Sequence, residues 1–171
     1  DGFLLKPVNP SMLFEALLRA LGTQKSAFNQ AIPMREKMKE GQSHLHGARI
    51  LLVEDNELNR QVARELLEGV GASVHETVNG LESLTAVATE SFDAVLMDIQ
   101  MPEMDGLTAS RRMRQNGITI PIIAMTAHAM PGDREKCLAA GMNDHISKPV
   151  DHRQLFAVLT LSLIHISEPT R

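Results

Sequence analysis

Two short stretches of this sequence, LLVED at residues 51–55 and VLMD at residues 95–98, each pass from an apolar run directly into acidic side chains. Such runs are typical of buried parallel strands, and burying an unpaired carboxylate costs several kcal/mol. Three acids at the ends of two strands therefore call for a cation nearby. A basic residue, Lys148, follows a third β-like run and is fixed by Pro149. Together these residues indicate a site where Mg²⁺ and a phosphoryl group meet.

The chain from Arg49 to about Leu161 alternates between runs typical of strands and runs typical of helices. We expect five strands, each followed by a helix, at residues 50–53, 73–77, 94–97, 120–125 and 145–147. Five such βα units in series predict an α/β fold, in which helices cover both faces of a doubly wound parallel sheet.

The environment of some helical side chains can also be predicted. In the helix after the first strand, the apolar residues at every fourth position from Val62 to Val70 are expected to face the core, with Ala63 and Leu67 beside them. The helix at residues 107–115 carries three arginines, Arg114 among them, and all three are expected to be largely solvated.

Polar residues follow four of the five expected strands. In an open parallel sheet the ligand site lies at the carboxyl ends of the strands, so these residues are expected to converge on one edge. They are Glu54, Asp55, Asp98, Thr126 and Lys148. The hydroxyl of Thr126 and the ammonium group of Lys148 can bind phosphoryl oxygens at that edge.

The three acids of this set can share one hard cation. Mg²⁺ prefers octahedral oxygen ligands, which Glu54, Asp55 and Asp98 would supply together with the backbone carbonyl of Gln100. One carboxylate oxygen of Asp98 would then remain free to attack phosphorus. Asp105, which precedes a glycine, is better explained as a turn residue.

A repeated motif defines the domain organisation. The sequence KPV at residues 6–8 recurs at residues 148–150, and in both places a helix cap and a matching Leu/Phe pattern follow. We therefore expect the C-terminal remnant of a preceding domain of the same kind at 1–22, a polar linker at 23–48, the domain itself at 49–161 and a non-native tail, resembling translated adapter sequence, at 162–171.

The composition excludes several classes of function. The aromatic content is 3% with no Trp or Tyr, and the net charge is −4, so direct binding to nucleic acid is not expected. The only cysteine, Cys137, excludes an internal disulfide and fits a reducing cytoplasm. No apolar run approaches the roughly 20 residues of a membrane span, and no contact of this fragment with a membrane is expected.

Four motifs in collinear order resemble the receiver domain of two-component response regulators. They are LVEDN at 52–56, MDIQMPEMDG at 97–106, MTA at 125–127 and SKP at 147–149. The resemblance covers about residues 49–161 and implies a flavodoxin-like (βα)5 fold of the CheY type, with strand order 2-1-3-4-5. The motifs are most similar to the C-terminal receiver of a hybrid sensor histidine kinase with tandem receivers.

The resemblance also implies roles for individual residues. Asp98 would be the phospho-acceptor. Thr126, Ala127 and Lys148 would bind the phosphoryl group, and His145 would take the place of the family's switch aromatic. The metal ligands would be Glu54, Asp55, Asp98 and the Gln100 carbonyl, and the bond between Lys148 and Pro149 would be cis. Gln100 and His128, each two positions past a site residue, are expected to tune the lifetime of the aspartyl phosphate.

The expected partner is a phosphohistidine donor, either a kinase domain or a histidine phosphotransfer domain. The expected cofactor is Mg²⁺, with Mn²⁺ as a substitute. We expect a cytoplasmic domain whose parent is a hybrid histidine kinase, compatible with an anchor in the inner membrane. Whether the chain itself is an enzyme stays open, since the fragment contains no kinase core.

Two other functions compete with this interpretation. A pseudo-receiver would bind partners without phosphorylation, which the presence of Asp98, Thr126 and Lys148 disfavours. An Mg²⁺-dependent aspartyl-phosphate phosphatase would carry its nucleophile on the first strand in a DxD-type pair. Here the first strand ends in Glu54 and Asp55, and the single acceptor follows the third strand.

Overall fold

The computed structural model describes residues 44–127 and 130–167. The expected remnant at 1–22, most of the expected linker, His128 and the last four residues lie outside this part. The described elements are, in chain order, β1 Arg49–Val53, α3 Glu57–Gly69, β2 Ser73–Thr77, α4 Gly80–Thr89, β3 Ala94–Asp98, α5 Gly106–Gln115, β4 Ile122–Thr126, α6 Pro131–Ala139, β5 Asp144–Ser147 and α7 His152–Ser167.

The five strands form one sheet in the order β2-β1-β3-β4-β5, and every neighbouring pair is parallel. This arrangement confirms the α/β fold and the strand order expected for a receiver. The register pairs Val53 with Met97 and Thr126 with Ser147. The last residues of these strands therefore lie at the same edge of the sheet, where the site residues follow.

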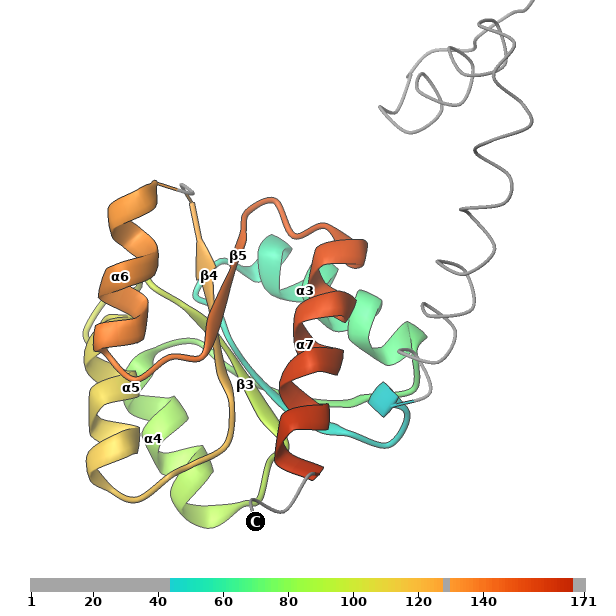
Figure 1. Ribbon diagram of the computed structural model, residues 1–171, viewed down its shortest axis with the longest axis horizontal. Helices are drawn as coiled ribbons and strands as arrows, with labels where there is room; N and C mark the ends of the chain where they lie inside the picture. The colour runs from blue at the N-terminus through green and yellow to red at the C-terminus, as the bar shows by residue number, and fades with distance from the viewer. Residues whose placement is uncertain (1–43, 128–129, 168–171) are drawn as a thin grey trace, which may run out of the picture. The chain divides into compact units, whose positions relative to one another are not determined.

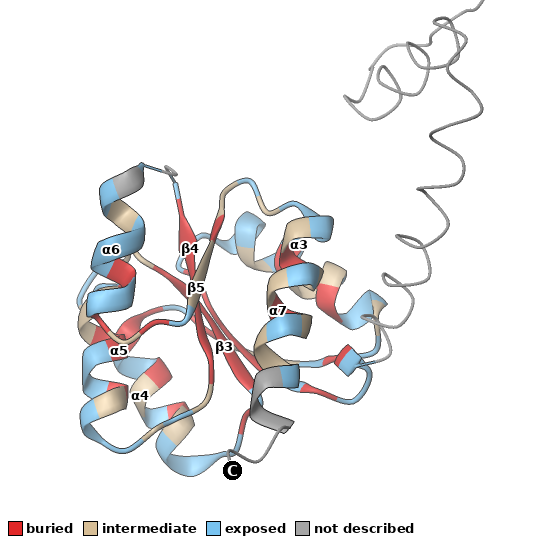
Figure 2. Cartoon of the chain, in the orientation of Figure 1, coloured by how far each residue is buried: buried red, intermediate tan, exposed pale blue. Residues whose placement is uncertain are grey.

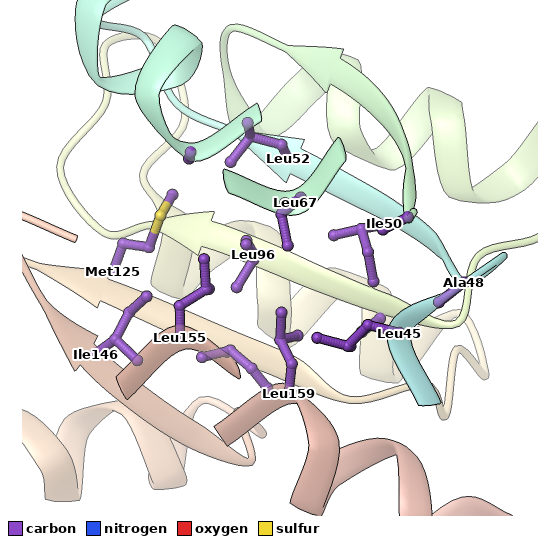
Figure 3. Close-up of a cluster of buried hydrophobic side chains, with 14 residues drawn as sticks. Leu45, Ala48, Ile50, Leu52, Leu67, Leu96, Met125, Ile146, Leu155 and Leu159 are labelled. Carbon is purple, nitrogen blue, oxygen red and sulfur yellow. The ribbon is translucent and has the colours of Figure 1, made fainter. Parts of the chain in front are cut away.

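Helices cover both faces of the sheet, with α3 and α7 on one face and α4, α5 and α6 on the other (Figure 1). All residues of β3 and β4 are buried between these layers (Figure 2). Side chains that alternate along the strands form two separate apolar clusters. In one cluster, Leu52 and Leu96 of the sheet pack with Leu67 of α3 and with Leu155 and Leu159 of α7 (Figure 3).

Most strand boundaries lie within one residue of the sequence-based expectation, and two element boundaries differ by more. Strand β4 begins at Ile122, two residues later than expected, because Pro121 has no N–H group to donate to a neighbouring strand. Helix α7 continues to Ser167, beyond the expected domain end at Leu161, and Leu163 packs against the core. The non-native origin of residues 162–171 stays a prediction.

The packing of two apolar segments also differs from the expectation. On α3, Ala63 and Leu67 are buried, whereas Val62 is 44% exposed, so the expectation that Val62 faces the core was wrong. Leu66 and Val70 of the expected face are partly buried and pack against the core, so the buried face is centred on Ala63 and Leu67. Within the range expected to be a linker, Leu45 and Ala48 belong to the buried core.

The prediction that Arg114 is solvated was wrong. Its guanidinium group is half-buried and donates hydrogen bonds to the carbonyl oxygens of Ile118, Ile120 and Gly141 and to Oδ1 of Asn143, at 2.7–2.9 Å. Arg114 therefore joins α5 to the segment before β4 and to the segment between α6 and β5. Burial lowers the pKa of this guanidinium group from its ordinary value.

None of the described helices combines the length and apolar character needed to cross a membrane. Cys137 is buried as a free thiol on α6, and burial raises its pKa.

Candidate functional site

The carboxyl ends of β1 and β3 bring three acidic side chains together. One carboxylate oxygen from each of Glu54, Asp55 and Asp98 lies within 4.8 Å of the other two. Glu54 is 1% and Asp98 3% exposed, whereas Asp55 is exposed to solvent. The structure thus places these acids where the sequence argument expected them, in one cluster at the edge of the sheet.

Lys148 is the cation that contacts this cluster. Its Nζ lies 2.7 Å from Oε2 of Glu54 and 2.9 Å from Oδ2 of Asp98. The backbone N–H of Lys148 donates to the carbonyl oxygen of Thr126 at 2.7 Å, and the bond from Lys148 to Pro149 is cis. The hydrogen bond holds the backbone of Lys148 beside the end of β4.

The pKa values of Asp98 and Lys148 are both shifted because the cluster holds more buried negative than positive charge. Burial raises the pKa of Asp98 from 3.8 to about 6; the hydrogen bond from Lys148 opposes this, and the charge of Glu54 adds to it. For Lys148, burial lowers the pKa, but hydrogen bonds to Glu54 and Asp98 and their charges outweigh burial, so the pKa is raised from its ordinary value. One lysine therefore leaves the three carboxylates short of positive charge.

Residues of the first turn of α3 hold Glu54 and Asp55 in place. Oε1 of Glu54 accepts hydrogen bonds from the N–H of Asn56 at 3.2 Å and from Nδ2 of Asn59 at 3.4 Å. Arg60 donates to the carbonyl oxygens of Glu54 and Asp55 at 2.9 and 3.3 Å. Sequence reasoning had missed Asn59 and Arg60 as site residues; their only signal was their position one helical turn after the acids.

A cavity of about 200 Å³ lies at the ends of β3 and β4, and its lining includes Gln100, Thr126, Ala127 and Lys136. The backbone N–H of Gln100 donates to Oδ1 of Asp98 at 3.2 Å. The buried Thr126 hydroxyl is 3.5 Å from the carbonyl oxygen of Ile146 on β5. The cavity therefore lies between the strand end that carries Thr126 and the loop that follows Asp98, where phosphoryl oxygens could find hydrogen-bond donors.

His145 lies on β5, three residues before Lys148. Its neighbour Ile146 faces the α3 and α7 layer, so alternation places His145 on the opposite face of the sheet, the face that α6 covers. Among the described residues, Nδ1 of His145 has no hydrogen-bond partner, and its nearest carboxylate oxygen belongs to Asp144 at 3.7 Å. His128 lies outside the described residues.

The donor set fits a hard divalent cation. All three side-chain donors are carboxylates, which suit Mg²⁺ or Mn²⁺ better than softer transition metals. Two of the three are buried, and the single lysine beside them leaves net negative charge in the cluster. A bound dication would supply the missing positive charge.

Comparisons with known proteins point to the same site chemistry. A family model for the response regulator receiver domain matches residues 50–160. The sensor histidine kinase GacS of Pseudomonas protegens is 36% identical over 164 residues, a match that covers 92% of this chain and 18% of GacS. The chain thus spans less than a fifth of the length of that relative.

Two solved structures extend the comparison. The receiver domain of sensor histidine kinase PA1611 from Pseudomonas aeruginosa is 41% identical, with a TM-score of 0.64, covering 68% of this chain and 98% of that one; its structure has a magnesium ion coordinated in the active site cleft. A co-crystal structure of the Saccharomyces cerevisiae phosphotransfer protein Ypd1 with the receiver domain of Ssk1 matches with a TM-score of 0.67 and 26% identity, covering 72% of this chain and 93% of that one.

Proposed function

Because the chain belongs to the response regulator receiver domain family, we propose that its domain accepts a phosphoryl group from a phosphohistidine onto Asp98 in a phosphorelay. The observation that carries this proposal is that Asp98 lies beside both the other two acids of the candidate metal site and the lysine that would bind the phosphoryl group. Its carboxylate clusters with those of Glu54 and Asp55, and its Oδ2 lies 2.9 Å from Nζ of Lys148.

Each residue of the site would have its own role in the transfer of the phosphoryl group. An oxygen of Asp98 attacks phosphorus, the bond from phosphorus to the donor imidazole breaks, and its electron pair stays on the imidazole nitrogen. A divalent cation held by Glu54, Asp55, Asp98 and the Gln100 carbonyl would stabilise negative charge on the phosphoryl oxygens. Lys148, already beside Asp98, would pair with one of those oxygens.

Phosphorylation would change the positions of the Thr126 and His145 side chains. Thr126 and Ala127 line the cavity at the ends of β3 and β4, so the hydroxyl of Thr126 and the backbone of Ala127 would bind the new phosphoryl oxygens. Movement of Thr126 toward the phosphoryl group would vacate space that His145, on the same face of the sheet, can fill. The change would then reach partners through the exposed side chains of α6 and the residue before it, among them Met130 and Leu138.

Gln100 and His128 would set the lifetime of the aspartyl phosphate. Gln100 is exposed and lies directly beside Asp98, where its side chain can restrict access of water. Replacing either residue should change the rate at which the phosphorylated domain hydrolyses. An unchanged rate in both variants would contradict this role.

The donor would be a histidine kinase domain or a histidine phosphotransfer domain. The parent protein would be a hybrid histidine kinase whose receiver lies in the cytoplasm, compatible with an anchor in the inner membrane. The support is the identity to GacS and the likeness to a receiver seen with Ypd1. Mg²⁺ is the proposed cofactor, and Mn²⁺, with the same preference for oxygen ligands, should replace it.

The direct test is incubation with acetyl phosphate and Mg²⁺, followed by intact-mass measurement. We expect an acid-stable, base-labile gain of one phosphoryl group, which EDTA and Asp98→Asn abolish. Asp93→Asn, which changes an acid whose carboxylate contacts the backbone of Arg49, is the control and should label normally. Labelling that survives Asp98→Asn would overturn the acceptor assignment; no labelling would favour a pseudo-receiver, and turnover of a phosphomonoester without stable labelling would favour a phosphatase.

A further inference from the structure

The loop between β3 and α5 is held by contacts at both of its ends. It carries Gln100, whose carbonyl is the proposed metal ligand. At its start the N–H of Ile99 donates to the carbonyl of Met125 at 3.2 Å, and at its end the N–H of Gly106 donates to the carbonyl of Ile99 at 2.9 Å. These bonds close the loop at its base but do not restrain the tip, which includes Glu103 and Met104.

The N-terminus of α4 restrains that tip. Nδ2 of Asn79 donates to Oε2 of Glu103 at 3.1 Å, and the N–H of Gly80 donates to the carbonyl of Met104 at 3.3 Å. The approach is close, since a Cβ added at Gly80 would lie 2.8 Å from the Met104 oxygen. A glycine at this position therefore lets the helix contact the loop backbone directly.

The side-chain amide of Asn79 makes hydrogen bonds with both helix α4 and the loop between β3 and α5. Its Oδ1 accepts from the N–H of Glu82 at 2.8 Å and so caps α4, while its Nδ2 contacts Glu103. Asp and Ser cap helices as well as Asn does, but a carboxylate cannot donate to Glu103. The helix cap alone does not require an amide here; the contact with the loop does.

Glu103 has a backbone conformation that glutamate rarely adopts. Its φ of 65° lies in the left-handed region, where Gly and Asn are preferred, and it is the only non-glycine residue with positive φ in the described part of the chain. Such a conformation persists where surrounding contacts stabilise it. The hydrogen bond from Asn79 is such a contact, and it acts on the residue at the tip of the loop.

We propose that Asn79 and Glu103 are positioning residues for the metal site: their hydrogen bond fixes the loop so that the Gln100 carbonyl faces the acid cluster. This inference rests on the proposed function, because it requires a divalent cation at Glu54, Asp55 and Asp98. Neither residue touches the reacting atoms. Their effect is on the affinity for the cation.

The hydrogen bond can be broken and then rebuilt with its direction reversed. Asn79→Asp keeps the helix cap but removes the donor and sets two carboxylates against each other. Glu103→Gln removes the charge and one acceptor oxygen. In the double variant Asn79→Asp/Glu103→Gln, the new amide at position 103 can donate to the new carboxylate at position 79. Glu57→Gln, an exposed acid two residues after Asp55, controls for the loss of one negative charge.

Mn²⁺ binding, followed by the electron paramagnetic resonance signal of the free ion and repeated as competition by Mg²⁺, gives the affinity. We expect Asn79→Asp to weaken binding about three- to tenfold, and the double variant to return to within about twofold of wild type. The added negative charge of Asn79→Asp would by itself strengthen cation binding. A loss of affinity therefore cannot come from charge alone.

A second readout separates positioning from loss of folding. Asn79→Asp should still unfold in one cooperative urea transition in EDTA, at a midpoint lowered by the buried carboxylate, and its labelling by acetyl phosphate should recover at saturating Mg²⁺. Wild-type affinity in both single variants, or a double variant that shows the sum of the two losses, would overturn the proposal. Failure of the proposed function would show differently, as absence of Mn²⁺ binding by the wild-type chain.

Discussion

The ammonium group of Lys148 lies 2.9 Å from the carboxylate of Asp98, the proposed phospho-acceptor. The same group is 2.7 Å from Glu54, and the side chain of Lys148 is only 18% exposed. Among the described residues, Lys148 is the only cation that pairs with the carboxylate groups of these two buried acids. Lys148 should therefore support folding as well as phosphoryl transfer.

Lys148→Gln should destabilise the metal-free domain by about 3 kcal/mol, because it leaves Glu54 and Asp98 buried without a counter-charge. Urea unfolding in EDTA, followed by circular dichroism, measures this loss, and saturating Mg²⁺ should reduce it. Lys136→Gln is the control: Lys136 is 68% exposed in its pair with Asp133, so its loss should cost less than about 0.5 kcal/mol. Equal effects of the two variants would contradict the role of Lys148.

Asp98→Asn should stabilise the metal-free domain at neutral pH. Burial and the charge of Glu54 raise the pKa of Asp98 from 3.8 to about 6, so the folded state binds the proton more tightly than the unfolded state. The stability that this proton provides is complete below about pH 3.8 and is lost as the pH rises through about 6. The advantage of Asp98→Asn should therefore grow across this window to about 2–3 kcal/mol.

Unfolding titrations in EDTA at several pH values test this expectation. A difference between wild type and Asp98→Asn that does not change with pH would contradict it. Asp93→Asn, an exposed acid before β3, should show no comparable gain. Mg²⁺ should reverse the order and favour wild type, since the cation needs the Asp98 carboxylate.

The central part of the site could be predicted because it follows from topology. Once the five strands are parallel, the residues after their carboxyl ends must meet at one edge, and Glu54, Asp55, Asp98 and Lys148 do so. The buried strands could also be predicted. Helices cover both faces of a parallel sheet, so its central strands appear in the sequence as continuous apolar runs.

The supporting contacts could not be predicted, because their partners are backbone atoms. Arg60 donates to the carbonyls of Glu54 and Asp55. Arg114 donates to two carbonyls in the segment before β4 and to one between α6 and β5. A carbonyl oxygen is present at every residue, so no side-chain pattern marks the partner. Val62 was misplaced because it lies at the margin of the apolar face, where the pattern of a short helix does not separate buried from exposed positions.

Gly106→Ala should damage the phospho-acceptor directly. A Cβ at this position would collide with the carbonyl oxygen of Asp98 and would lie 2.9 Å from Cγ of Met97. Since the first contact is with backbone, the end of β3 would have to move. We expect a loss of about 2 kcal/mol in stability together with reduced labelling. Gly132→Ala, where nothing lies within 4 Å, is the matched control and should be neutral or slightly stabilising. A similar outcome for both variants would contradict the steric argument.

Arg114→Lys should destabilise the domain without removing charge. The guanidinium of Arg114 donates to three carbonyl oxygens and to Asn143, and a lysine ammonium cannot reproduce this planar fork. Because several half-buried acceptors lose their donor, we expect a loss of about 2 kcal/mol in urea unfolding. Arg111→Lys, on the exposed side of the same helix, should change stability by less than about 0.5 kcal/mol. If Arg114→Lys is equally silent, the contacts of Arg114 with the segments before β4 and β5 do not stabilise the domain.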